Sequence, residues 1–394
     1  MERIYDSIGV NAGVVVDPFM GSAVTGTAAR ARGLDFVGIE AHPLIASLAR
    51  AKLHVLVTAA EIRASADAIC RRSMAKIADS SIDERRAACQ NETNLIKRSF
   101  DPTVLHQLIV VRDEIILCET EGVARYLQWA LLGTLRDVAH VKVGWPYQRP
   151  ALRRQPRSSD VTGRFLGRID AIASDIAGLS PSTTHATILA GDSSARETWA
   201  AWAATGTASV SSPPYLNNFD YADATRLEMY FWGMARTWKE LCERARKDML
   251  TATTQQSSKP AMEQAIEQID QLGSASAEVK DLTGQLTEER RARGTRAKQY
   301  DQVIPVYFLQ MQMVLRNMAE KLQSGARCAW LIGDSAPYGV YIDTPRLIGE
   351  LAEGEGYRVR ADSLLRKRGH RWVASGQRHQ VELGERLLVF ERTA

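Results

Sequence analysis

The sequence predicts an α/β protein built on a doubly wound, mostly parallel Rossmann-like sheet that is interrupted by largely helical insertions. Two observations lead to this prediction. Short, continuous apolar runs of the kind found in strands buried on both faces recur along the chain, and they alternate with stretches of helical periodicity. The apolar runs lie at 12–16, 35–40, 187–192, 207–210, 328–334, 357–359 and 386–391.

The composition is that of an ordinary globular protein, with 45% apolar and 24% charged residues over 394 positions. The formal charge is only +4, so any affinity for nucleic acid has to come from local clusters of basic residues. The five cysteines are odd in number and far apart, which predicts reduced thiols and no metal site. The first residues lack the apolar core of a signal peptide, and the longest apolar run, at 108–111, is too short to cross a bilayer. We therefore expect a cytoplasmic protein without membrane association.

The first predicted strand ends in a loop of small residues, DPFMGSA, which runs from Asp17 to Ala23 and precedes a helical stretch at 28–32. A small-residue loop between a strand and a helix lets backbone N–H groups and the helix dipole approach a ligand. Glu40 closes the second strand about 20 residues after this loop, the spacing at which a carboxylate accepts hydrogen bonds from ribose hydroxyls. The segment therefore predicts a site for a cofactor that carries a nucleoside.

A double proline ends the strand at 207–210, because proline donates no hydrogen bond to a ladder and fixes its own φ. The residues at this turn are Ser212, Pro213, Pro214 and Tyr215. A stiff turn at the carboxyl end of a strand holds carbonyls and an aromatic ring where open α/β sheets bind ligands. The alternative interpretation is a rigid loop without chemistry.

Together, DPFxGS, the following FVGIE and the later SPPY resemble the cofactor and catalytic motifs of the S-adenosylmethionine-dependent DNA amino-methyltransferases. The resemblance implies S-adenosylmethionine as cofactor, DNA as partner, and a sheet that closes with a C-terminal hairpin. It also implies that the acid closing the run at 187–192 contacts the adenine of the cofactor, although this acid fits the N-cap of a helix at 195–204 equally well. The implied cofactor-binding residues are Asp17, Pro18, Phe19, Gly21, Ser22, Glu40 and Asp192, and the implied catalytic residues are Ser212, Pro213, Pro214 and Tyr215.

The chemistry of an exocyclic amine explains why such a turn is useful. The lone pair of this nitrogen is delocalised into the ring, and donation of its N–H bonds to fixed acceptors frees it for attack. The acceptors we expect are the Ser212 hydroxyl oxygen and the Pro213 carbonyl, and fixed dipoles need no reorganisation during the reaction. Tyr215 is expected to stack on a base that has left the duplex. Ala23 stands where the family has a second glycine, and its methyl group is expected to crowd the cofactor.

Three further groups are candidates for contacting nucleic acid. Phe219 and Tyr221 follow the SPPY turn and fit the other wall of a base pocket, with Asn218 or Asp220 reading the edge of the base. The alternative is a helix cap with packed aromatics. A basic stretch, including Arg149, Arg153 and Arg154 together with Trp145, Tyr147 and Phe165, predicts a loop that binds phosphates and stacks on bases, or alternatively a solvated surface loop. A basic run at 290–298 fits either a backbone contact or an exposed helix face.

These assignments predict a discontinuous core at 1–52, 184–236 and 301–394. The insertion at 53–183 is helical, carries the basic loop and is the candidate target-recognition region. A second helical insertion at 237–300 includes a polar stretch at 251–260 that predicts a mobile linker.

The target base and the polymer stay open at this stage. Ser212 favours cytosine N4 as the acceptor, whereas the motif order is commoner for adenine N6, and we prefer cytosine. The resemblance also implies a site-specific enzyme of restriction–modification or phage defence, with a cognate restriction or defence-system subunit as partner. One alternative is an RNA methyltransferase acting on a guanine amino group of transfer RNA. Another is a non-catalytic nucleic-acid-binding subunit, suggested by Ala23 and by the short segment before the first strand.

Overall fold

The computed structural model describes residues 2–143, 149–179, 183–217, 220–254, 256, 259–368 and 381–393. The chain divides into two compact units, each assembled from separate segments. The sheet unit comprises Met1–Ala49, Ser182–Asp220 and Arg246–Ala394. The helical unit comprises Arg50–Pro181 and Tyr221–Ala245.

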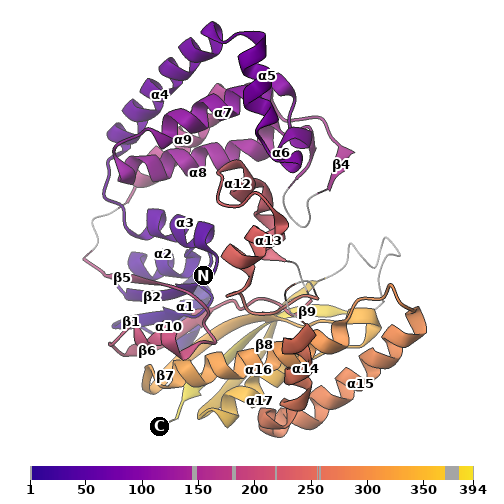
Figure 1. Ribbon diagram of the computed structural model, residues 1–394. Helices are drawn as coiled ribbons and strands as arrows, with labels where there is room; N and C mark the ends of the chain where they lie inside the picture. Colours follow the sequence, from indigo (N-terminus) through magenta and orange to yellow (C-terminus); the bar gives the residue numbers. More distant parts are fainter. Residues whose placement is uncertain are drawn as a thin grey trace. The chain divides into compact units, whose positions relative to one another are not determined.

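The sheet unit is built on a seven-stranded mixed sheet whose order is β5-β2-β1-β6-β7-β9-β8 (Figure 1). Five neighbouring strands, from β5 to β7, run parallel, and β9 is antiparallel to both β7 and β8. The predicted α/β class, mostly parallel with a C-terminal hairpin, is confirmed. The strands are β1 Val14–Asp17, β2 Asp35–Glu40, β5 Ala186–Ala190, β6 Gly206–Ser211, β7 Leu322–Gly333, β8 Tyr357–Arg368 and β9 Leu383–Arg392.

The strand order places a topological switch point between β1 and β6. From β1 the chain winds outward through β2 to β5 on one side, and it continues from β6 through β7 on the other. Val15 pairs with Ala208 and Val16 with Ser209, so the two strands run in register toward the same edge. In open α/β sheets, ligands bind outside the carboxyl ends of the strands at such a point.

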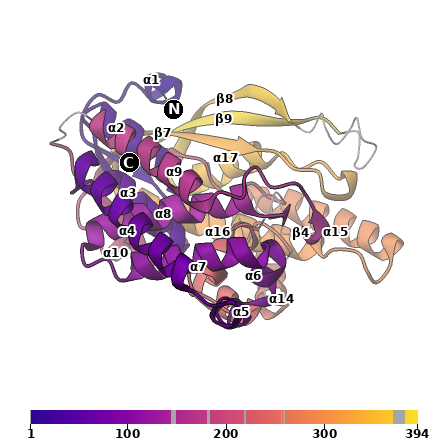
Figure 2. The ribbon, with the colours of Figure 1, turned by 90° about the horizontal axis from the view of Figure 1, so that it is seen from above.

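Helices cover both faces of this sheet (Figure 2). The helices α1 and α2 lie on one face, where the buried Tyr5 hydroxyl of α1 donates a 3.0 Å hydrogen bond to the carbonyl of Thr25 in α2. The helices α16 and α17 pack on the other face, and Tyr307 and Trp330 are fully buried in the apolar core there. The bounds are α1 Glu2–Ile8, α2 Val24–Ala31, α10 Arg196–Ala200, α16 Tyr300–Ala319, a 3₁₀ turn η3 Pro337–Gly339 and α17 Thr344–Gly354.

The segment after residue 246 belongs to the sheet unit, although the sequence predicts a separate insertion at 237–300. Its elements are α14 Lys259–Glu267, a 3₁₀ segment η2 Ile269–Ala275 and α15 Ser276–Arg293. Met262, Leu272 and Val279 are buried in the same apolar core as α16. Helical periodicity identifies this apolar face, but it does not say which surface the face packs against.

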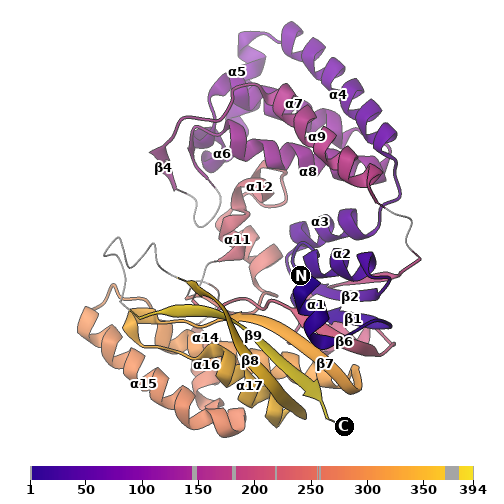
Figure 3. The ribbon, with the colours of Figure 1, turned by 180° about the vertical axis from the view of Figure 1, so that it is seen from behind.

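The helical unit is formed mainly by antiparallel and crossing helices, with α7, α8 and α9 packed side by side and α4 against them (Figure 3). The helix α3 leads the chain from the sheet unit into this unit. The bounds are α3 Pro43–Leu53, α4 Ala59–Asp79, α5 Ile82–Gln90, α6 Asn94–Ser99, α7 Pro102–Ile116, α8 Glu121–Val138, β3 Val141–Lys142, β4 Arg149–Arg153 and α9 Val161–Ala177.

The segment from 221 to 245 joins the helical unit, whereas the sequence predicts that residues up to 236 stay with the core. The Arg112 guanidinium donates a 2.8 Å hydrogen bond to the carbonyl of Phe231 and lies over its ring. Arg136 forms a 2.6 Å ion pair with the buried Glu228. The elements here are α11 Tyr221–Ala224, α12 Arg226–Phe231, α13 Trp238–Leu241 and a π-helical turn η1 Cys242–Arg246. Across the described parts of both units, no helix has the length and apolar character that a bilayer span requires.

Candidate functional site

The two sequence motifs meet at the carboxyl edge of β1 and β6. Asp17 ends β1 and Ser211 ends β6, and both are about 1% exposed. The Ser211 hydroxyl donates a 2.6 Å hydrogen bond to Oδ1 of Asp17, and the same oxygen accepts a 3.0 Å bond from the backbone N–H of Phe19. The cofactor-like loop and the double-proline turn are therefore joined at their roots.

The loop after β1 folds back over the end of β2. The Met20 N–H donates a 3.0 Å bond to the carbonyl of Ile39, and Gly38 leaves room for the Met20 side chain. A Cβ at Gly38 would lie 2.5 Å from the Met20 sulfur, which is too close for any side chain. The glycine of the FVGIE segment is thus required by this close approach of the loop.

Two residues of this loop have left-handed backbone conformations. Gly21 has φ 53°, and a Cβ built on it meets nothing within 4 Å, so open space lies beside its backbone. Ala23 has φ 60°, a region that glycine occupies without strain. Because Ala23 is fully buried, its methyl group is covered by protein and does not line an open space. This finding differs from the expectation that the methyl group crowds the cofactor.

Glu40 stands beside this loop at the end of β2 and is partly exposed. Its carboxylate accepts a 2.7 Å hydrogen bond from the backbone N–H of His42 and another from the backbone of Gly21. Burial nevertheless raises the pKa of Glu40 to about 7, because desolvation of the charged form outweighs these two bonds. A carboxylate at this position can accept hydrogen bonds from ligand hydroxyls most effectively above that pH.

Asp192 lies at the end of the neighbouring strand β5, next to Glu40. The N–H of Gly191 donates a 3.2 Å bond to the carbonyl of Glu40, which ties the two strand ends together. Ser194 donates to Oδ1 of Asp192 through both its backbone N–H and its hydroxyl, each at 2.8 Å. The N-cap of α10 is Ala195, so Asp192 closes a local turn and does not cap that helix. Burial raises the pKa of the Asp192 carboxyl.

Asp17 is the most buried acid of the site. Burial raises its pKa to about 6, while hydrogen bonds from Ser211, Thr25 and the Phe19 N–H favour its charged form. Phe19 itself packs edge-on against Trp330, with ring centroids 6.2 Å apart, so its ring anchors the loop to the apolar core. Asp17 and Phe19 therefore fix the loop, and the open space lies at Gly21.

The double-proline turn is held by a hydrogen bond from α16, and its Ser212 side chain faces solvent. Ser212 is exposed and Pro213 is buried. The Tyr307 hydroxyl of α16 donates a 3.0 Å bond to the carbonyl of Pro214, not to that of Pro213. Tyr215 is partly exposed, and its hydroxyl shares a hydrogen bond with the Ser212 side chain. Burial raises the pKa of Tyr215, so the phenol is neutral at physiological pH.

Comparisons with known proteins identify no family for this chain. No protein-family model matches the chain, and no curated protein matches it.

The residues that follow the SPPY turn are placed differently from one another. Asn218 and Phe219 lie outside the described residues. Asp220 is 1% exposed and forms a buried ion pair with Arg246 in the sheet unit. Tyr221 begins α11 of the helical unit and is 36% exposed. The structure thus assigns Asp220 an electrostatic contact within the fold.

The stretch at 251–254 is not a mobile linker. Thr251, Ala252 and Thr253 are buried, and the Thr251 N–H donates a 2.8 Å bond to the Gln310 side chain. The carbonyl of Ala252 accepts a 2.7 Å bond from the N–H of Asn217, two residues after the SPPY turn. Polar composition suggested mobility, but backbone hydrogen bonds to neighbouring segments order these residues. Residues 255, 257 and 258 lie outside the described residues, and the predicted linker ends in the first turn of α14, which begins at Lys259.

The predicted basic loop is partly regular structure in the helical unit. Trp145, Tyr147 and the Arg149 side chain lie outside the described residues. Arg153 is exposed at the end of β4, whereas Arg154 donates to the carbonyls of Ala139 and Arg136 at the end of α8. Phe165 is fully buried in α9, which contradicts its expected role as a stacking ring, because its helical spacing places it on the apolar face.

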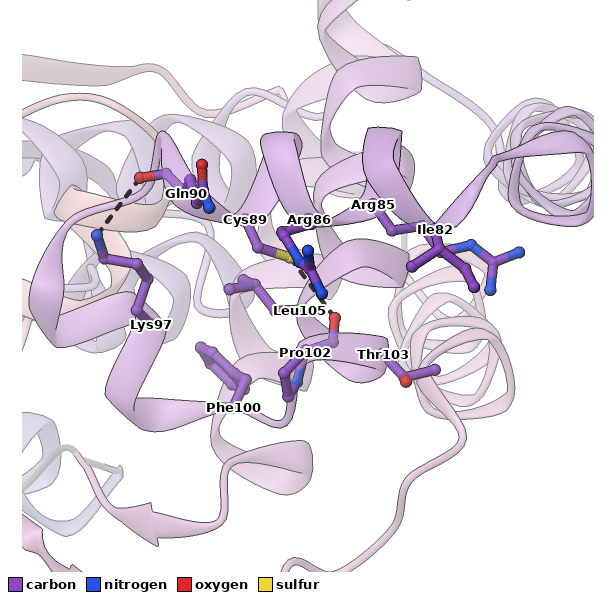
Figure 4. Close-up of a pocket in the computed structure, with 10 residues that line it drawn as sticks. All are labelled: Ile82, Arg85, Arg86, Cys89, Gln90, Lys97, Phe100, Pro102, Thr103 and Leu105. Carbon is purple, nitrogen blue, oxygen red and sulfur yellow. Dashed lines mark hydrogen bonds between the residues drawn. The ribbon is translucent and has the colours of Figure 1, made fainter.

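A cavity of about 520 Å³ opens in the helical unit between α5, α6 and α7 (Figure 4). Arg85, Arg86 and Lys97 line it together with the apolar Phe100 and Leu105. The Lys97 ammonium donates a 3.4 Å bond to the carbonyl of Gln90 at one side. The cations favour an anionic ligand with an apolar part, and the residues lining this cavity include none of those predicted from the sequence.

Several residues that organise the site are not apparent from the sequence. Ser211, Tyr307 and Arg368 reach it from β6, α16 and the end of β8, and only the first stands next to a motif. The basic run at 290–298 is partly neutralised, since Arg290 pairs with Asp301 at 2.8 Å. Among the described residues, no group of histidine, cysteine, aspartate and glutamate side chains is arranged to hold a metal ion.

Proposed function

We propose that this protein transfers a methyl group from S-adenosylmethionine to the exocyclic amino group of a base flipped out of DNA, with cytosine N4 favoured over adenine N6. The observation that carries the proposal is the hydrogen bond between Ser211 and Asp17. It brings the roots of the cofactor-like loop and the SPPY turn together at the switch point of the sheet. A methyl donor and an amine acceptor have to meet over such an edge.

The chain offers groups that suit S-adenosylmethionine. The open space beside Gly21 lets backbone N–H groups approach the ligand, and Glu40 and Asp192 stand at neighbouring strand ends. Glu40 would accept hydrogen bonds from the ribose hydroxyls, and Asp192 would accept one from the adenine amino group. When bound, this cofactor supplies an electrophilic methyl group on a sulfonium. The protein binds and orients the cofactor.

The SPPY turn would prepare the acceptor. The exposed Ser212 hydroxyl oxygen and the Pro213 carbonyl accept the two N–H bonds of the amine, which increases the electron density available at its nitrogen. The bond from Tyr307 to the neighbouring Pro214 carbonyl holds these acceptors in place before the base arrives. Tyr215 provides a face on which the flipped base stacks. Fixed dipoles of this kind stabilise the charge that develops on nitrogen.

Transfer of a labelled methyl group tests the proposal directly. The purified chain is incubated with labelled S-adenosylmethionine and separate pools of DNA and RNA, and the methylated nucleoside is identified by mass spectrometry. We expect N4-methylcytosine in DNA. Label in N6-methyladenine would correct the base, and label only in RNA would favour an RNA methyltransferase. Absence of transfer together with absence of calorimetric cofactor binding would favour a non-catalytic nucleic-acid-binding subunit.

A pair of variants separates the two halves of the site. Tyr215→Ala should abolish transfer and leave cofactor affinity within about threefold, because the ring serves the base. Asp192→Ala should weaken cofactor binding about tenfold or more, the order expected for losing a charged hydrogen bond. A large loss of cofactor affinity in Tyr215→Ala would place the ring in the cofactor pocket and contradict these roles. A cognate restriction or defence-system subunit remains part of the proposal and is tested by co-purification from the source cells.

A further inference from the structure

Arg368, the last residue of β8, stacks on the ring that the SPPY turn presents. Its guanidinium carbon lies 5.0 Å from the centroid of the Tyr215 ring, and one N–H donates a 3.2 Å bond to the carbonyl of Asp334. A cation over an aromatic face is held by the ring quadrupole. The contact sets a positive charge directly against the ring of the SPPY turn.

Gly333, at the end of β7, creates the space for this stack. A Cβ at Gly333 would lie 2.7 Å from Cδ2 of Tyr215 and would overlap the guanidinium of Arg368. The absence of a side chain at Gly333 therefore allows the ring and the guanidinium to lie against the end of β7. The three residues come from separate strands and turns, so the arrangement is tertiary.

The charge of Arg368 is not balanced by a direct ion pair within the described residues. Its neighbour Arg366 pairs with Glu385 through bonds of 2.5 and 2.9 Å. Lys367 forms a 2.9 Å ion pair with Glu382. The Asp334 carboxylate lies close enough to interact with Arg368, but its oxygens accept bonds from the Gly384 N–H and the Tyr341 hydroxyl. Arg368 instead contacts a carbonyl and an aromatic face, and both leave its positive charge in place.

We propose that Arg368 binds a backbone phosphate of the nucleotide whose base stacks on Tyr215. This inference rests on the proposed function, because it takes Tyr215 as the base platform. A nucleotide that turns out of a strand brings its own phosphates to the mouth of the pocket. Guanidinium groups present several N–H donors in one plane, and the carbonyl of Asp334 uses one of them. Arg368 then serves as a phosphate contact and positions the Tyr215 ring.

The salt dependence of binding tests this contact. The affinity of the full chain for a fluorescein-labelled, single-stranded oligodeoxynucleotide of mixed sequence is measured by anisotropy at several salt concentrations. Each phosphate contact contributes about 0.7 to the slope of log affinity against log salt. Arg368→Gln removes the charge and keeps a donor for the Asp334 carbonyl, so the variant is expected to fold. We expect its slope to fall by about 0.7 and its affinity to fall several-fold.

Two matched variants identify the cause. Arg358 is exposed near the start of the same strand, so Arg358→Gln removes one charge far along the strand from Tyr215 and should leave the slope unchanged. Arg368→Lys keeps the charge and should keep the slope, but it loses the planar stack and should lower kcat more than it raises KM. An unchanged slope in Arg368→Gln, or an equal loss in Arg358→Gln, would overturn the proposal.

The outcomes also distinguish this inference from the proposed function. A changed slope in Arg368→Gln without any methyl transfer would retain the phosphate contact and reject the enzyme. Methyl transfer to DNA with an unchanged slope would retain the enzyme and reject the contact. Binding is measured without cofactor, so neither result depends on the other.

Discussion

The Ser211 hydroxyl donates a 2.6 Å hydrogen bond to the Asp17 carboxylate across 194 residues of sequence. Both side chains are almost completely buried, and the acceptor is an ionisable group held in a dry environment. Such a bond is stronger than a neutral one and is costly to leave unmade. It ties the two loops of the candidate site to one edge of the sheet and makes the site sensitive to pH.

Replacing Asp17 should change the pH dependence of stability. Its pKa is raised from 3.8 to about 6, so its contribution to stability is full below about pH 3.8 and is lost as the pH rises through 6. Asp17→Asn keeps an acceptor for Ser211 and removes this titration. Between about pH 5 and 7.5, the wild type should lose about 1–2 kcal/mol of unfolding free energy relative to Asp17→Asn. Urea unfolding at both pH values measures this difference, and parallel profiles would contradict it.

Glu40 should control the pH dependence of cofactor binding. Its pKa is raised to about 7, and only its charged form is a good acceptor for ribose hydroxyls. Calorimetry should therefore show S-adenosylmethionine binding about tenfold more tightly at pH 8 than at about pH 6. Glu40→Gln should bind more weakly at high pH and show little dependence on pH. A wild-type affinity that is the same at both pH values would exclude this role for Glu40.

Gly21 and Ala23 should differ in their response to exchange of a methyl group, with the larger effect at Gly21. Gly21→Ala places a side chain in the open space and in a left-handed conformation, so cofactor affinity should fall and stability should fall by about 1 kcal/mol. Ala23→Gly relieves a similar strain but loses a buried methyl, so stability should change by less than about 1 kcal/mol. Cofactor affinity should stay within about threefold, since this methyl is covered. Calorimetry and thermal unfolding of both variants provide the comparison, and a large gain in affinity for Ala23→Gly would show that the methyl obstructs the cofactor.

Loss of the Tyr307 hydroxyl should lower kcat for methyl transfer, although its effect on the free energy of unfolding is small. Its hydroxyl bonds the Pro214 carbonyl, whereas the Tyr357 hydroxyl makes a comparable 3.1 Å bond to the carbonyl of Leu315 in α16, outside the motif loops. Tyr307→Phe and Tyr357→Phe should each lose about 1 kcal/mol of stability. Only Tyr307→Phe should lower kcat for methyl transfer, because it loosens the SPPY turn. Equal rates in the two variants would show that this bond has no role in positioning.

The buried ion pair of Asp220 and Arg246 should be costly to break. Both side chains are at most 8% exposed, so removal of the cation takes an ion-pair partner away from a buried carboxylate. Arg246→Met should lose about 3–5 kcal/mol of unfolding free energy. The double variant Asp220→Asn with Arg246→Met should recover most of this loss. Chemical denaturation of the two proteins measures the coupling, and an equally unstable double variant would mean that packing dominates.

The fold could be predicted because its signals are local. Buried parallel strands appear as continuous apolar runs, and Pro213 and Pro214 end a strand wherever they occur. The sequence did not predict which unit the segments 221–245 and 246–300 belong to. An amphipathic helix has an apolar face that must be buried, but its sequence does not specify the surface against which that face packs. The predictions of a mobile linker at 251–254 and of a stacking role for Phe165 were wrong for the same reason. The polarity or aromaticity of a residue does not determine which residues it contacts in the folded protein.

The sequence alone determined the strands, the loop from Asp17 to Ala23, the acid at Glu40 and the proline turn, because dihedral preferences and hydrophobic periodicity act between neighbouring residues. Tertiary structure decided that Ser211 bonds Asp17, that Tyr307 holds the Pro214 carbonyl, and that Arg368 covers Tyr215. It also decided the raised pKa values of Asp17 and Glu40. These properties depend on groups far apart in the chain and on the exclusion of water, and both arise only when the sheet and its helices pack together.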